Sequence, residues 1–153
     1  MGAGGLLRQM AVVLSSTPCE GGRGMSQAKH DDAMLLMKVA EVSALRGMPS
    51  AANFLWGDEF DPNYEEFSKR HRVGSEAYGK AVLLATHYET LATFWKHGLI
   101  DEELLFDLVI ISEVWDRLKE FVYAGRERLN NPRIGENFEA LAEAASRVPV
   151  AAG

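Results

Sequence analysis

The histidines come first, because imidazole is the commonest metal ligand in proteins and a frequent acid–base group. They are His30, His71, His87 and His97. A helical zinc site needs two histidines four residues apart, and a di-iron bundle needs Glu-x-x-His steps. Neither spacing occurs in this sequence. We therefore predict no metal site and no cofactor.

Nucleophilic catalysis finds equally little support. The single cysteine, Cys19, lies near the N-terminus, and no Gly-x-Ser-x-Gly elbow is present. Glycines crowd only residues 1–24, where no strand precedes them, so they do not form a phosphate-binding loop. The sequence accordingly predicts no catalytic residues.

One polar constellation remains, formed by His87, Glu89, Trp115 and Arg126. Arg126 follows Trp115 by eleven residues, which returns to nearly the same face of a helix. If the two helices run antiparallel, Glu89 and Arg126 approach each other. Such a pair beside a tryptophan is either a site for a small ligand or an enzymatic reaction, or a structural pair that fixes how two helices dock. We expect the structural pair, because buried ion pairs more often serve that purpose.

Composition narrows the classes of protein. The chain has 153 residues, of which 47% are hydrophobic and 25% charged, as expected for one globular domain. A formal net charge of -6 disfavours binding to nucleic acid. No apolar run approaches the ~20 residues of a membrane span. A single cysteine fits a reducing compartment, so we expect a soluble cytoplasmic protein.

Residues 1–24 differ from the remainder of the chain. Glycines lie at both ends of this segment, and the apolar stretch of residues 6–14 is interrupted by Arg8 and Gln9. That stretch is too short and polar for a signal peptide. We predict a flexible leader over residues 1–24, with Met25 as a candidate true start, and a single helical domain over residues 25–153.

Apolar spacing and capping residues predict helices throughout that domain. Ser26 is a plausible cap for the first helix, and Asp61 followed by Pro62 is a strong start signal further on. Gly98 is placed as a left-handed C-cap. The expected helices cover residues 27–46, 50–56, 62–72, 75–96 and 135–148, in addition to one long helix.

The clearest pattern predicts that long helix over about residues 101–130. Asp101 is its expected cap, and Asn130 precedes the Asn131-Pro132 step that ends it. Apolar residues recur at alternating steps of four and three, as one buried helix face requires. They are Leu104, Leu108, Ile111, Trp115, Leu118 and Val122. The predicted fold is therefore an all-α, single-domain bundle of about five or six helices around one long helix.

Several short motifs together are similar to a bacterial all-helical family that is catalogued only as a domain of unknown function. The similarity covers about residues 30–145 and includes a glutamate, a glycine-containing turn, a tryptophan, an arginine and a late Phe-Glu-x-Leu step. These motifs are His87-Tyr88-Glu89, Gly98-Leu99-Ile100-Asp101, Trp115-Asp116-Arg117-Leu118-Lys119, Arg126 and Asn137-Phe138-Glu139-Ala140-Leu141. The resemblance supplies no catalytic residues. It implies that Glu89, Trp115, Arg126 and Phe138 belong to one structural nucleus.

Three functions therefore stay open at this point. The leading hypothesis is a non-enzymatic helical module that binds a protein partner, either a second copy of itself or another protein. The alternative is a small-ligand or enzymatic site between the helices that bear Glu89 and Arg126. A nucleic-acid regulator that uses the basic residues within 69–72 and 126–133 is least favoured, because the net charge is negative.

Overall fold

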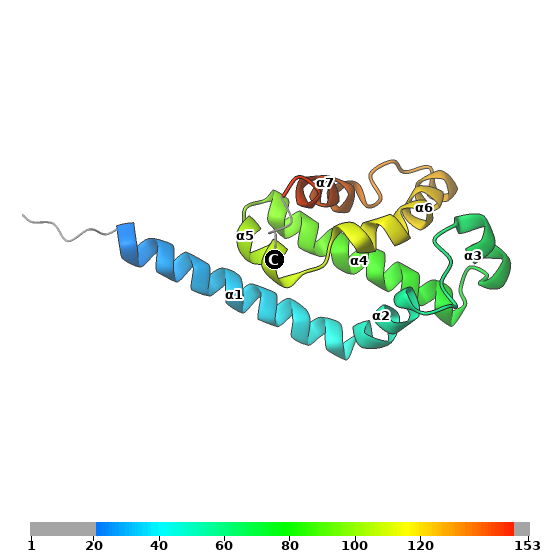
Figure 1. The fold of residues 1–153 in the computed structure, drawn as a ribbon, viewed down its shortest axis with the longest axis horizontal. Coiled ribbons are helices and arrows are strands. Elements are labelled where there is room, and N and C mark those ends of the chain that lie inside the picture. The colour runs from blue at the N-terminus through cyan, green and yellow to red at the C-terminus, as the bar shows by residue number, and fades with distance from the viewer. Residues whose placement is uncertain (1–20, 149–153) are drawn as a thin grey trace, which may run out of the picture. The chain divides into compact units, whose positions relative to one another are not determined.

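The computed structural model describes residues 21–148. These residues form seven helices and contain no strand, so the all-α prediction is confirmed, with at least one helix more than expected. The helices, labelled in Figure 1, are α1 (Gly21–Leu45), α2 (Met48–Trp56), α3 (Tyr64–Arg70), α4 (Glu76–Lys96), α5 (Glu102–Leu108), α6 (Ser112–Leu129) and α7 (Glu136–Ala145).

The chain divides into two units at a boundary inside α1, between Asp31 and Asp32. The positions and contacts described below belong to the larger unit, which begins at Asp32. The predicted leader, residues 1–24, lies outside the described residues except for its last four, with which α1 begins. The predicted helix start after Ser26 is wrong, because α1 is already helical at Gly21.

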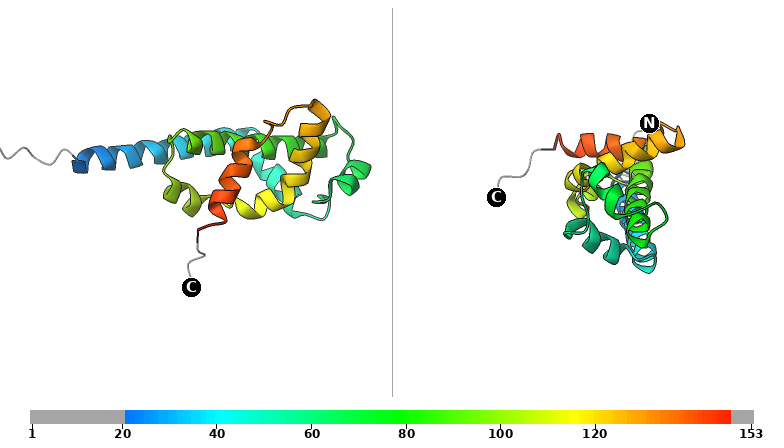
Figure 2. Two further views of the ribbon diagram at one scale, coloured as in Figure 1. Left: turned by 90° about the horizontal axis from the view of Figure 1, so that it is seen from above. Right: turned by 90° about the vertical axis from the view of Figure 1, so that its right-hand side faces the viewer.

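Within the larger unit, α4 packs more extensively against other helices than any other helix does. It contacts α2, α6 and α7, and α6 also contacts α3 and α7. Figure 2 shows α7 crossing α4. The prediction that a long helix after Asp101 would form the centre is therefore wrong, and α4 takes that place. Two groups of aromatic side chains fill the core, one of Phe54, Phe60, Phe67, Tyr78 and Phe121, and one of Tyr88, Trp115 and Phe138.

The predicted long helix over residues 101–130 is in fact two helices. α5 ends at Leu108, and Val109 adopts an extended backbone before α6 begins at Ser112. Leu105 and Ile111 are both buried, but six residues of continuous helix would turn them towards different sides. The break allows both side chains to face the core. It falls at three consecutive β-branched residues, 109–111, where helix propensity is low.

This break changes which residues of the predicted apolar face are buried. Ile111, Trp115, Leu118 and Val122 are buried, as the seam predicts. Leu108 is 65% exposed, contrary to its predicted place in the seam. We refer to residues 109–111, between the two helices, as the α5–α6 link. Ile110 in this link is 60% exposed.

The helix boundaries follow the capping residues where those act locally. The Asp101 carboxylate accepts from the Leu104 N–H at 2.9 Å and caps α5, as predicted. Gly98 and Asn130 both adopt left-handed backbones after α4 and α6, with φ of 66° and 47°. The predicted start at Asp61-Pro62 is wrong by two residues, because the Asn63 side chain caps α3 instead.

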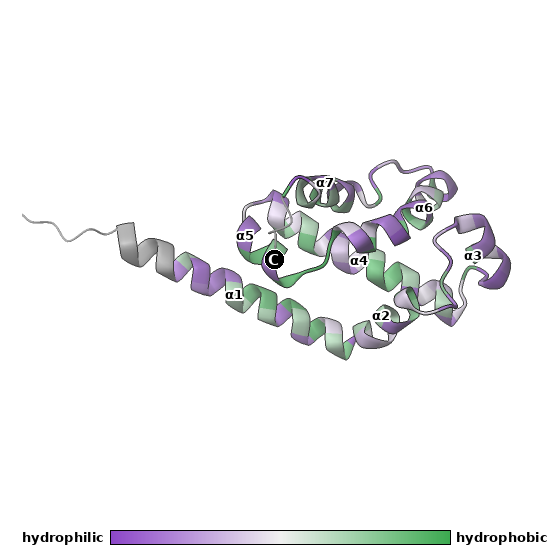
Figure 3. Cartoon of the chain, in the orientation of Figure 1, coloured by the Kyte–Doolittle hydropathy of each residue, from purple (hydrophilic) through white to green (hydrophobic). Residues whose placement is uncertain are grey.

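Hydropathy along the ribbon is shown in Figure 3, where the second half of α1 carries several hydrophobic residues. Within residues 21–148, none of the helices combines the length and the apolar character needed to cross a membrane.

Candidate functional site

Glu89 holds the beginning of α7. Its Oε2 accepts from the backbone N–H of Phe138 at 2.8 Å, and its Oε1 accepts from the Asn137 side-chain amide at 2.8 Å. These atoms lie in the first turn of α7, where backbone N–H groups have no partner within the helix and the helix dipole favours negative charge. The carboxylate on α4 therefore serves as a cap for a helix far away in the sequence.

Arg126 also holds the beginning of α7 and the turn before it. Its Nε donates to the carbonyl oxygen of Ile134 at 2.7 Å, and its Nη2 donates to Glu139 Oε2 at 2.7 Å. The guanidinium also lies over the Tyr123 ring, 5.1 Å from its centroid. Arg126 thus ties the end of α6 to the turn before α7 and to α7 itself.

The Glu139 carboxylate is shared between two donors. Tyr123 donates its hydroxyl to Oε1 at 2.7 Å, while Arg126 binds Oε2. Burial raises the pKa of Glu139, but the hydrogen bonds from Tyr123 and Arg126 outweigh it, so the pKa lies below its ordinary value. The carboxylate therefore stays charged at neutral pH, which keeps the link to Arg126 intact.

The expected approach of Glu89 and Arg126 is not observed. No hydrogen bond or ion pair joins them in the part of the chain that the structure describes, and each binds α7 separately. Trp115 packs edge-on against Phe138 with ring centroids 4.9 Å apart, and Phe138 is fully buried. Glu89, Trp115 and Arg126 therefore converge on α7 rather than on each other. A ligand-binding role for them stays a prediction.

His87 belongs to a different part of the structure. Its Nδ1 forms a hydrogen bond of 2.9 Å with the Ser43 hydroxyl, which connects α4 to α1. Burial lowers the pKa of His87, so the imidazole is neutral at pH 7. The four sequence-predicted residues thus form two separate groups, one that holds α7 and one that holds α1.

Two cavities meet at the hydrogen bond between Ser43 and His87, and both residues line each of them. One cavity of about 260 Å³ lies between α1 and α4. The other, of about 540 Å³, lies between α1, α2, α4 and the end of α5, and Ser43 and His87 are the only polar residues that line it. Glu89, Trp115 and Arg126 line neither cavity.

A third cavity, of about 600 Å³, surrounds the α5–α6 link. Trp56, Leu108 and Ile110 line it, and all three are more than half exposed. Leu108 also lines the cavity of about 540 Å³ beside α1. Apolar surface therefore continues from α1 across the link to α2.

Several basic residues of the two clusters, residues 69–72 and 126–133, form ion pairs with acidic side chains. Lys69 lies 3.1 Å from Glu65 and 2.7 Å from Glu66, and Arg70 pairs with Asp61 at 2.8 Å. In the second cluster, Arg126 and Arg133 pair with Glu139 and Glu136. This arrangement leaves less free positive charge for phosphate groups than the sequence suggested. Among the residues described, no group of three or more histidine, cysteine, aspartate or glutamate side chains could hold a metal ion.

Some positioning residues did not stand out in the sequence. Ser43 is the partner of His87, and Asp32 accepts from the backbone N–H of Asp101 at 2.9 Å. Arg117 donates to the Leu55 carbonyl at 2.8 Å and fixes α6 to α2. No local pattern marks Ser43, Asp32 or Arg117, because each partner lies more than forty residues away.

Acidification is expected to weaken the fold through His87. Its pKa is lowered in the folded state, whereas in the unfolded chain it is about 6.5. As the pH falls, the unfolded chain therefore binds a proton at His87 before the folded protein does. The contribution of neutral, buried His87 to the free energy of unfolding is fully present above about pH 6.5 and is lost as the pH falls below that value. Denaturant midpoints at about pH 8 and about pH 5.5 should differ more for the natural protein than for His87→Asn.

The exposed His97 supplies the control, because His97→Asn should keep the full difference. An equal loss in the natural protein and His87→Asn would contradict this expectation.

A family model described as a domain of unknown function (DUF4760) matches residues 30–145. The match confirms the resemblance that the short motifs indicated. No curated protein and no solved structure matches the chain.

Proposed function

The chain belongs to the DUF4760 family, whose function is unknown, and on that premise we propose that it is a non-enzymatic helical module that acts by binding protein. A second copy of the same chain is the partner that the surface fits best. The single observation behind this proposal is the number of large apolar side chains that face solvent around α1, rather than any catalytic feature.

On α1 these side chains are Met34, Met37 and Leu45, which are 57%, 68% and 83% exposed. Isolated exposed apolar residues are common, but several on one helix indicate an interaction surface. Leu108, the last residue of α5, and Ile110 in the α5–α6 link add to the exposed apolar surface. Association would remove this surface from water, and that is the driving force we propose.

The polar candidates support the same proposal. Glu89 and Arg126 form hydrogen bonds with α7, and His87 forms one with Ser43. These bonds give each residue a structural purpose without a substrate. The compartment remains part of the proposal, since a single cysteine favours the reducing cytoplasm.

Light scattering of the full chain tests the proposal. Between about 1 µM and about 1 mM, the mass should rise from that of one chain towards that of two. Leu45→Asp should weaken the association at least tenfold, because it places a charge on the apolar surface. Val73→Asp is the matched control, since Val73 is 56% exposed in the turn before α4 and should leave the association unchanged. A single-chain mass over the whole range would overturn the proposal.

A further inference from the structure

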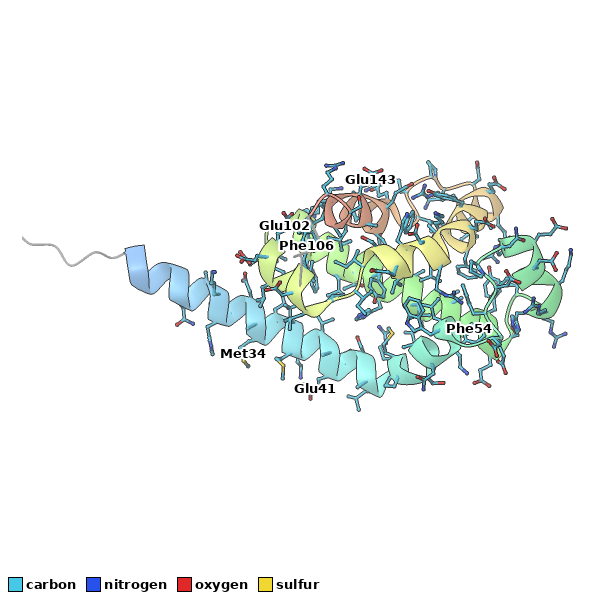
Figure 4. The ribbon with its side chains drawn as sticks, viewed as in Figure 1. Met34, Glu41, Phe54, Glu102, Phe106 and Glu143 are labelled. Atoms are coloured by element: carbon cyan, nitrogen blue, oxygen red, sulfur yellow. The ribbon has the colours of Figure 1, made fainter. Side chains whose placement is uncertain are left out.

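The outer face of α1 carries a seam of exposed residues with the spacing of a helix–helix contact. Met34, Lys38, Glu41 and Leu45 follow one another at steps of four, three and four, the alternation that keeps one stripe against a partner helix. All four side chains are exposed. Figure 4 shows Met34 and Glu41 on the side of α1 that points away from α4. We call these four residues the α1 seam.

The α1 seam is symmetric about its own centre. Met34 and Leu45 lie equally far from the level midway between Val39 and Ala40, and so do Lys38 and Glu41. Met37 and Val42, exposed on either flank, obey the same symmetry. A two-fold axis at that level would place Met34 against Leu45 of a second copy, with Met37 of both copies along one flank of the contact and Val42 of both copies along the other. This is the self-complementarity that an isologous interface requires.

The charged residues at the centre of the α1 seam favour an antiparallel over a parallel pair of α1 helices. Lys38 and Glu41 form an ion pair of 2.9 Å within one chain. In an antiparallel pair, Lys38 of each copy meets Glu41 of the other, and the four charges form one network across the axis. In a parallel pair in register, lysine would meet lysine and glutamate would meet glutamate, which is repulsive. Polar residues inside such a seam fix its register at some cost in stability.

We propose that two copies of this chain pair through α1 in antiparallel orientation, about a two-fold axis between Val39 and Ala40. This inference rests on the proposed function and adds the surface, the register and the orientation. The seam spans about 16 Å of helix, so the contact is small and the dimer is a reversible one.

Exchange of charges tests the register. Lys38→Glu opposes acidic side chains across the axis, and Glu41→Lys opposes basic ones, so each variant alone should associate at least tenfold more weakly than the natural protein. An equimolar mixture of the two variants should regain association, because each acidic seam then faces a basic one. The double variant Lys38→Glu/Glu41→Lys should also associate. Far-UV circular dichroism checks that all variants stay folded.

Cysteine cross-linking tests the orientation, in a Cys19→Ser background. Met34→Cys/Leu45→Cys should give a disulfide-linked dimer on mild oxidation. Eleven residues of helix separate the two positions, about 16 Å, so they cannot bond within one chain. Met34→Cys alone should not cross-link, because the two copies of residue 34 lie at opposite ends of an antiparallel seam.

The outcomes separate the two proposals. If the natural protein associates but the charge variants and their mixture behave like it, the α1 register is overturned and self-association stands. Cross-linking of Met34→Cys alone would overturn the antiparallel orientation, and so would the absence of any cross-link in the double cysteine variant. If the natural protein remains a single chain up to about 1 mM, both proposals fail.

Discussion

Trp115→Ala should lower the free energy of unfolding by about 3–5 kcal/mol. Trp115 is only 8% exposed, and its ring packs edge-on against Phe138 at 4.9 Å and Tyr123 at 5.8 Å. Removal of the indole leaves a cavity between α6 and α7 that rigid neighbours cannot fill. The loss therefore includes both the transfer of apolar surface and the cavity.

Urea titration followed by far-UV circular dichroism measures this loss without relying on tryptophan fluorescence. Trp56→Ala is the matched control, because it removes the same side chain from a position that is 53% exposed. Its cost should stay below about 1 kcal/mol. A loss that small for Trp115→Ala would instead show that the ring does not support α7, and would favour the ligand-binding role predicted for Trp115 from the sequence.

Sequence alone predicts those parts of the fold that depend on neighbouring residues. Asp101, Gly98 and Asn130 act within a few residues of themselves, and each ends or begins a helix as predicted. Burial of Trp115 follows from its spacing within an amphipathic helix, which is also local information.

The break after Leu108 could not be predicted in the same way. Steps of four and three are equally compatible with one straight helix and with two shorter ones. The choice depends on the packing of Leu105 and Ile111, whose neighbours come from elements far away in the sequence. β-branched residues at 109–111 were the only local signal, and helix propensity alone is weak.

The candidate site also combines features that the sequence predicts with features that depend on distant residues. Sequence selected Glu89, Trp115 and Arg126, which do contact one helix and its preceding turn, but it paired Glu89 with Arg126. Glu89 instead binds backbone N–H groups 48 and 49 residues away. Backbone groups carry no side-chain signature, so neither partner could be identified before the topology was known.

Gly135 provides the second large effect, because it places the start of α7 against α6. Its φ of 65° lies in the left-handed region, and an added Cβ would lie 2.6 Å from Val122 Cγ1. Gly135→Ala should therefore cost about 2–4 kcal/mol, from backbone strain of about 1 kcal/mol and a clash that moves Val122 or α7. The free energy of unfolding from urea titration measures the loss.

Two other glycines separate these causes. Gly98 has a nearly equal φ of 66° but no atom near its Cβ position, so Gly98→Ala should show the strain alone, about 1 kcal/mol. Gly79 lies inside α4 with open space around it, and Gly79→Ala should stabilise by about 0.5–1 kcal/mol. The excess loss at Gly135 over Gly98 reports the contact with Val122, and Val122→Ala in the Gly135→Ala background should reduce that excess. Equal losses at Gly135 and Gly98 would show that α7 moves away from Val122 at little cost, so that the contact of Gly135 with Val122 does not fix the position of α7.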